Sequence, residues 1–150
     1  MDIAKLKEVL ISEKNNKVKG GLYHTSQVTF AYNSNKMEGS TLSEEETEAI
    51  FKTESLVSSE KDKNLLDDMI ETKNHFKLFD YMLDNIDEPL SKDMIIEMNK
   101  ILKKDTSDEK NPKYNVGGFK TMPNMIGLVN VIKTSKPEDV SKDIDELLYY

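Results

Sequence analysis

The chain has 150 residues, a length that fits one structural domain with a modest core. Its 28 acidic and 21 basic residues give a net charge of −7, which argues against nucleic-acid partners. The absence of cysteine excludes disulfides, thiolate nucleophiles and cysteine-based zinc sites. No apolar run approaches the roughly 20 residues that span a bilayer, and no signal-peptide core follows Met1, so we expect a cytoplasmic protein without a membrane partner.

Apolar residues recur at helical spacing almost everywhere before about residue 105, so we predict a mainly α fold. The first expected helix covers residues 2–15. The second begins after Gly20-Gly21 and ends at Gly39, a residue that suits a helix C-terminus. The residues expected to face the core from these two helices are Ile3, Leu6, Leu10, Ile11, Leu22, Val28, Ala31 and Phe30.

The next three expected helices carry start or stop signals. Ser43 and Glu46 have the spacing of a capping box, which begins a helix. A polar stretch at residues 58–60 separates this helix from the longest periodic run, which Pro89 is expected to end. Ser91 is the expected N-cap of the helix that follows. The apolar stripe of the long run consists of Leu65, Leu66, Met69, Ile70, Phe76, Phe79 and Leu83.

The pattern changes after Asp105. Proline and glycine residues then separate short apolar segments, which indicates a loop followed by a small hairpin at about residues 115–133. A last helix restarts at Pro137, with acidic residues in its first turn. Because the sequence stops at Tyr150 inside this amphipathic helix, we expect further residues to follow it.

The segment Ser34-Asn35-Lys36-Met37-Glu38-Gly39 resembles the inhibitory helix of Fic-family protein adenylyltransferases. Ser34 and Glu38 lie four residues apart, so both project from one helix face. Without further matches, a solvated helix face would be the better interpretation of this pair. Three later segments resemble Fic proteins in the same order, namely Asn74-His75, Gly118-Phe119-Lys120-Thr121 and residues 136–148. The resemblance spans about residues 20–150 and implies a Fic-like helical bundle, incomplete at its C-terminus.

The resemblance implies transfer of AMP from ATP to a hydroxyl side chain of a target protein, with Mg²⁺ as cofactor. The family's catalytic motif reads His-Pro-Phe, two residues, Gly-Asn-Gly-Arg, and these residues do not contain it. Neither His24 nor His75 lies in such a context, and His75 is expected to be structural. We therefore assign no catalytic residue and no metal ligand within the chain, and we expect ATP and Mg²⁺ to bind the complete enzyme.

The resemblance also implies self-inhibition, with Glu38 paired to an arginine of the catalytic motif so that the γ-phosphate of ATP cannot take its productive pose. All 21 basic residues are lysine, so that arginine must lie outside these residues. Ser34 and Gly39 complete the inhibitory motif. The alternative is a noncatalytic regulator or binding module, a degenerate or split Fic protein whose Glu38 helix acts on a partner in trans.

The predicted hairpin resembles the Fic flap, whose edge pairs with an extended segment of the target. The residues expected to dock the target are Gly118, Lys120, Thr121, Met122, Pro123 and Ile126. Pro123 limits which edge can pair, because it has no amide donor. The flap favours the enzyme, since a pure inhibitor would need no docking hairpin, whereas a natural end at Tyr150 would favour the regulator.

We divide the chain into N-terminal helices at residues 1–60, which include the inhibitory helix, and the front part of a Fic core at residues 61–150. Both parts are expected to form one structural domain. Helices that the resemblance places after residue 150 would cover an apolar face of this domain. Exposure of that face predicts aggregation or a homo-oligomer of the chain as written.

Overall fold

The computed structural model describes residues 2–53, 63–127 and 132–150, which fall into two compact units at residues 1–87 and 88–150. The described residues are mainly helical, with one small antiparallel hairpin, as the sequence predicts. The boundary predicted at residue 60 lies outside the described residues. No helix in the described ranges is long and apolar enough to cross a membrane.

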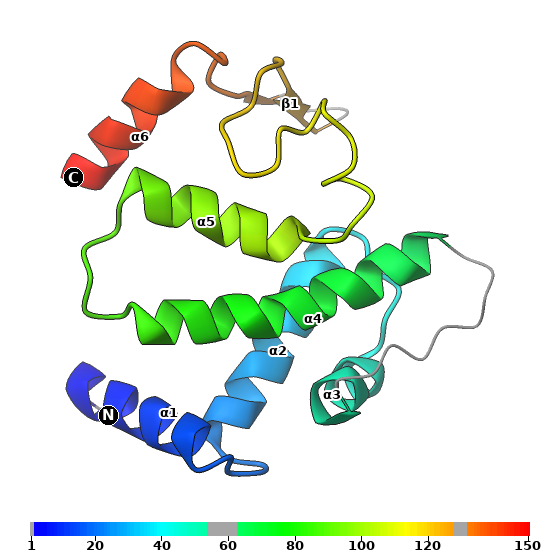
Figure 1. Ribbon diagram of the computed structural model, residues 1–150, viewed down its shortest axis with the longest axis vertical. Coiled ribbons are helices and arrows are strands. Elements are labelled where there is room, and N and C mark those ends of the chain that lie inside the picture. Colours follow the sequence, from blue (N-terminus) through cyan, green and yellow to red (C-terminus); the bar gives the residue numbers. More distant parts are fainter. Residues whose placement is uncertain (1, 54–62, 128–131) are drawn as a thin grey trace. The chain divides into compact units, whose positions relative to one another are not determined.

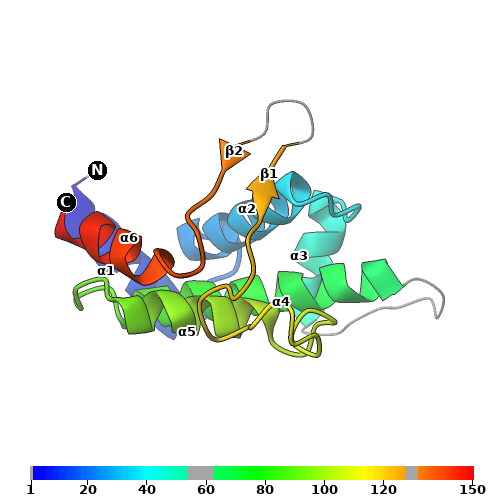
Figure 2. The ribbon, with the colours of Figure 1, turned by 90° about the horizontal axis from the view of Figure 1, so that it is seen from above.

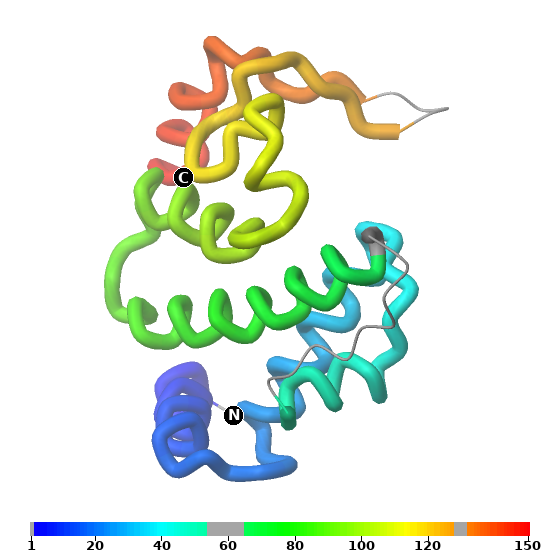
Figure 3. Tube along the Cα trace, turned by 45° about the vertical axis from the view of Figure 1, so that its right-hand side comes forward, coloured from blue at the N-terminus to red at the C-terminus, as the bar shows by residue number. Residues whose placement is uncertain are grey.

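The described residues of the first unit form four helices, of which α2 is central. They are α1 (Ile3–Asn15), α2 (Leu22–Met37), α3 (Glu44–Thr53) and α4 (Lys63–Asp84). Helix α2 packs against each of the other three, and α3 also packs against α4 (Figures 1 and 3). The predicted inhibitory segment is therefore the end of the helix that holds this unit together.

The predicted capping box at the start of α3 is confirmed. The Ser43 N–H donates to Glu46 Oε2 at 2.8 Å, and the Glu46 N–H donates to Ser43 Oγ at 3.1 Å. By contrast, α4 ends at Asp84, before the predicted stop at Pro89. The Asn85 side chain donates to the Tyr81 carbonyl at 2.8 Å, and this local bond competes with continuation of the helix.

The buried face of α2 is partly polar, which the apolar periodicity did not indicate. Val28 and Ala31 are buried as predicted, but Gln27 and Asn35 lie in the same buried face. The expected core residues Ile3, Leu22, Phe30 and Leu66 are 83%, 37%, 47% and 41% exposed, so their placement in the core was wrong. The apolar core cluster consists of Leu42, Ile50 and Met69, with Leu65 and Phe76 packed against it.

The second unit contains α5 (Lys92–Lys103), strands β1 (Met125–Ile126) and β2 (Ile132–Lys133), and α6 (Val140–Tyr149). Ser91 caps α5 as predicted, since its side chain accepts the Met94 N–H at 3.2 Å. Lys92 Nζ joins α5 to α6 through Asp145 Oδ2 at 2.6 Å. The two strands lie side by side and pair antiparallel (Figure 2). Met125 lies opposite Lys133 in their register. Helix α6 begins three residues after Pro137, later than predicted.

Candidate functional site

The end of α2 forms a hydrogen-bonded turn around Gly39. The Gly39 N–H donates to the Lys36 carbonyl at 3.2 Å, and the Ser40 N–H donates to the Asn35 carbonyl at 3.0 Å. Gly39 has φ +97°, so the three features together make a Schellman motif. The helix stop predicted at Gly39 is confirmed, and the turn fixes Glu38 at the C-cap of the helix.

Glu38 is exposed, and no cation is paired with its carboxylate in the part of the chain that the structure describes. Ser34 lies one turn earlier and is half-buried. A negative charge at a helix C-terminus is unfavourable because the helix dipole places partial negative charge there. A cation that binds Glu38 would relieve this repulsion. The turn thus fixes the backbone of Glu38, and the exposed carboxylate is suited to accept a cationic partner.

A buried hydrogen bond anchors this helix end to α4. Asn35 Nδ2 donates to Thr72 Oγ1 at 2.7 Å, and Thr72 Oγ1 in turn donates to the Asp68 carbonyl at 2.8 Å. Asn35 is 6% exposed and Thr72 is fully buried. Sequence reasoning missed both residues, although Asn35 is spaced four residues from Ala31 on the buried face.

Replacing Gly39 by alanine is expected to lower the free energy of unfolding by about 1–2 kcal/mol, because a Cβ atom is strained in the left-handed region. Space does not limit this position, since no atom lies within 4 Å of an added Cβ. Gly39→Asn is the matched control and should cost less, because asparagine tolerates this conformation. Urea denaturation followed by circular dichroism measures both variants. Equal losses for alanine and asparagine would contradict the backbone explanation.

The hairpin presents exposed residues, as a docking edge requires. Thr121, Met122, Pro123 and Ile126 are all exposed. Lys120 instead braces the hairpin, because its Nζ donates to Asn124 Oδ1 and to Thr134 Oγ1, each at 2.6 Å. Gly118 is close to the Asn115 side chain, where an added Cβ would lie 2.6 Å from Nδ2. We assign Lys120 and Gly118 to the shape of the hairpin, while target docking stays a prediction.

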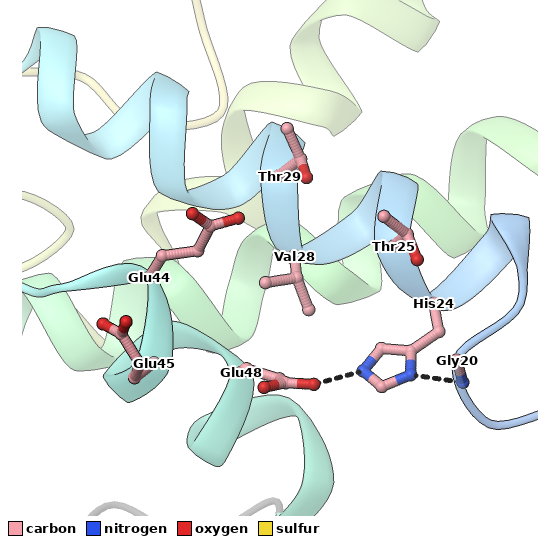
Figure 4. Close-up of a pocket in the computed structure, with 8 residues that line it drawn as sticks. All are labelled: Gly20, His24, Thr25, Val28, Thr29, Glu44, Glu45 and Glu48. Atoms are coloured by element: carbon pink, nitrogen blue, oxygen red, sulfur yellow. Dashed lines mark hydrogen bonds and ion pairs between the residues drawn. The ribbon is translucent and has the colours of Figure 1, made fainter.

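His24 lines a pocket of about 270 Å³ between α2 and α3 (Figure 4). Its Nδ1 accepts the Gly20 N–H at 2.8 Å, so a neutral ring carries its proton on Nε2, which faces Glu48 Oε1 at 3.6 Å. The ring also stacks on Phe51 with centroids 4.6 Å apart. A hydrogen bond from Lys52 lowers the pKa of Glu48 and keeps it anionic. These contacts give His24 a structural role that joins a loop to two helices.

A second polar network joins α2 to α4 through Asp80. The Tyr23 hydroxyl donates to Asp80 Oδ1 at 2.6 Å, and Gln27 Nε2 donates to the same oxygen at 3.4 Å. Lys14 Nζ lies 3.7 Å from it. Burial and then the hydrogen bond to Asp80 raise the pKa of Tyr23 well above its usual range. Tyr23 therefore stays protonated and remains a donor in neutral solution.

Stability is expected to fall as the pH rises above about 10, partly because of Tyr23. In the unfolded chain Tyr23 loses its proton near that pH, whereas in the folded chain it keeps the proton, so alkali favours unfolding. The Tyr23→Phe variant keeps the ring and removes this titration. Its free energy of unfolding should decline less steeply between pH 9 and 11 than that of the parent. Parallel pH profiles for the two proteins would contradict the assignment.

No group of three or more carboxylate or imidazole side chains in the described ranges could hold a metal ion. This observation leaves the expected Mg²⁺ of the complete enzyme untested. No protein-family model matches the chain, and no curated protein matches it at a significant level.

Proposed function

We propose that these residues are the regulatory front part of a self-inhibited Fic protein adenylyltransferase, which transfers AMP from ATP to a hydroxyl side chain of a protein. One observation carries the proposal. Glu38 is an exposed carboxylate that the Gly39 turn holds at the end of α2, without a paired cation among the described residues. An arginine of the catalytic motif is the partner that the sequence resemblance implies.

The fixed position of Glu38 makes it an effective inhibitor in this proposal. A guanidinium group matches a carboxylate with two parallel hydrogen bonds, and an arginine so engaged cannot also bind the γ-phosphate of ATP. The Schellman turn and the Asn35–Thr72 hydrogen bond order the helix end beforehand, so little further ordering is needed when the pair forms. Release of inhibition then requires movement of this helix end or competition for the arginine.

The described residues supply neither an arginine nor a metal cluster, so nucleotide and Mg²⁺ binding is assigned to none of them. Their proposed contribution is control by Glu38 and docking of the target by the hairpin. Exposed backbone and side chains at residues 121–126 offer an edge to an extended target segment.

Labelled ATP tests the proposed activity with the full product of the gene. Label on the α-phosphate should enter protein in the presence of Mg²⁺, whereas label on the γ-phosphate should not, because AMP transfer releases pyrophosphate. The Glu38→Gly variant serves as the form of the protein that lacks self-inhibition. Transfer of the γ-label would indicate a kinase instead. No transfer by either form would favour a noncatalytic regulator.

A further inference from the structure

Another pocket, of about 470 Å³, lies in the first unit and is lined by residues from the end of α1, the loop after it, and α2, α3 and α4. Its volume falls within the roughly 300–1,000 Å³ that is typical of small-molecule sites. Aromatic residues and lysines dominate its lining. This combination differs from the acidic pocket around His24, and the function proposed above does not use it.

Three aromatic rings form one wall of this pocket. Phe51 and Phe76 meet edge to face, with ring centroids 5.0 Å apart and an interplanar angle of 84°. Tyr23 meets Phe51 in the same manner at 6.5 Å. Because each ring is held by another, the wall is rigid and apolar. Such a surface suits a flat aromatic ligand.

Positive charge exceeds negative charge at the pocket. Four lysines line it, namely Lys14, Lys17, Lys73 and Lys77, and Asp80 is the carboxylate among its lining residues. Lys14 pairs with Asp80 and, at 2.5 Å, with Asp84. Lys77 donates to the neutral oxygen of Asn74 at 3.1 Å, and no carboxylate pairs with Lys17 or Lys77 within the described residues.

Asp80 is paired with Lys14, and no ion pair joins it to Lys17 or Lys77 within the described residues. Tyr23, Gln27 and Lys14 all approach one of its oxygens, as described above. In a chain whose net charge is −7, a pocket in which Lys17 and Lys77 have no carboxylate partner among the described residues is a local exception. It would attract an anion that the rest of the surface repels.

We propose that this pocket binds a small aromatic anion, a flat apolar ring system that carries one acidic group. The rings of Tyr23, Phe51 and Phe76 contact the body of the ligand, and Lys17 and Lys77 bind its acidic group. Tyr23 and Glu38 are fifteen residues apart in sequence, about 22 Å along a helix. The pocket is thus at the opposite end of α2 from Glu38 and binds its ligand whether or not the inhibitory proposal holds.

Two fluorescent probes of nearly the same shape test the proposal with the full chain. Anilinonaphthalene sulfonate is an aromatic anion with a flat naphthalene ring system and one sulfonate, and phenylnaphthylamine is its uncharged counterpart. The double variant Lys17→Gln/Lys77→Gln should bind the sulfonate about tenfold more weakly, because two ammonium contacts are lost. Its affinity for the uncharged probe should not change, because the aromatic wall is intact.

The matched control is Lys5→Gln/Lys36→Gln, which removes two exposed lysines of the same unit that do not line the pocket. This control should bind both probes like the parent chain. Unchanged sulfonate binding by the pocket variant would overturn the proposal. An equal loss in the control, or an equal loss of the uncharged probe, would overturn it too, because the effect would then reflect overall charge or general damage.

Discussion

Glu38→Gly is expected to raise AMP transfer by the full gene product roughly ten- to a hundredfold. A hydrogen bond to a charged group contributes about 1.5–3 kcal/mol. Its loss should raise the fraction of enzyme whose arginine is free to bind ATP by the corresponding factor. Glycine adopts the φ of −87° found at Glu38, so the turn that ends α2 is retained. Incorporation of α-labelled ATP into protein per unit time measures the effect.

Two further variants show whether the change in AMP transfer arises from the charge of Glu38 or from a general disturbance of the helix end. Glu38→Gln keeps the size of the side chain and should also raise transfer, because it removes the negative charge that holds the arginine. Lys36→Gln changes an exposed residue in the same turn and should leave transfer unchanged. Unchanged or lower transfer by a folded Glu38→Gly protein would count against self-inhibition by this residue.

Thr72→Val is expected to lower the free energy of unfolding by about 1–3 kcal/mol, because it leaves the buried Asn35 Nδ2 donor without its acceptor. Valine has nearly the same shape as threonine, so the change removes a hydrogen bond and leaves no large cavity. Thermal or urea denaturation of the chain measures the loss. Looser anchoring of the helix end should also raise AMP transfer in the full gene product.

A double-mutant cycle assigns this loss to the Asn35–Thr72 pair. Asn35→Ala and Thr72→Val together should cost less than the sum of the single variants, with a coupling of about 0.5–3 kcal/mol. Thr29→Val, an exposed threonine of α2, is the matched control and should change stability by less than about 0.5 kcal/mol. A Thr72→Val loss no larger than that of the control would contradict the anchoring role.

Local signals in the sequence predicted the features whose partners lie close along the chain. The capping box joins Ser43 and Glu46, which are three positions apart in the sequence, and the cap of α5 joins Ser91 and Met94 at the same separation. The end of α2 at Gly39 likewise depends on the positive φ of a single residue, a conformation that glycine favours. Each of these is determined by a few neighbouring residues, so the mainly helical order of the chain followed from the sequence.

Contacts between distant residues were not predictable in the same way. Asn35 and Thr72 are 37 residues apart, and Tyr23 and Asp80 are 57 apart. The Asn35–Thr72 pair is buried and the Tyr23–Asp80 pair is partly buried, whereas a pattern based on apolar residues assigns such polar groups to solvent. The lysine-rich pocket depends on the same tertiary contacts. The inhibitory motif was proposed from family resemblance, and its role stays a prediction.

The gene read onward from the codon for Tyr150, together with the intact mass of the purified protein, tests the central claim most directly. The claim is that these residues are the front part of a Fic enzyme whose Glu38 restrains a later arginine. The account predicts an open frame that reaches His-Pro-Phe and Gly-Asn-Gly-Arg within a few tens of residues. A stop codon directly after Tyr150, with an intact mass of 17.2 kDa, would contradict it.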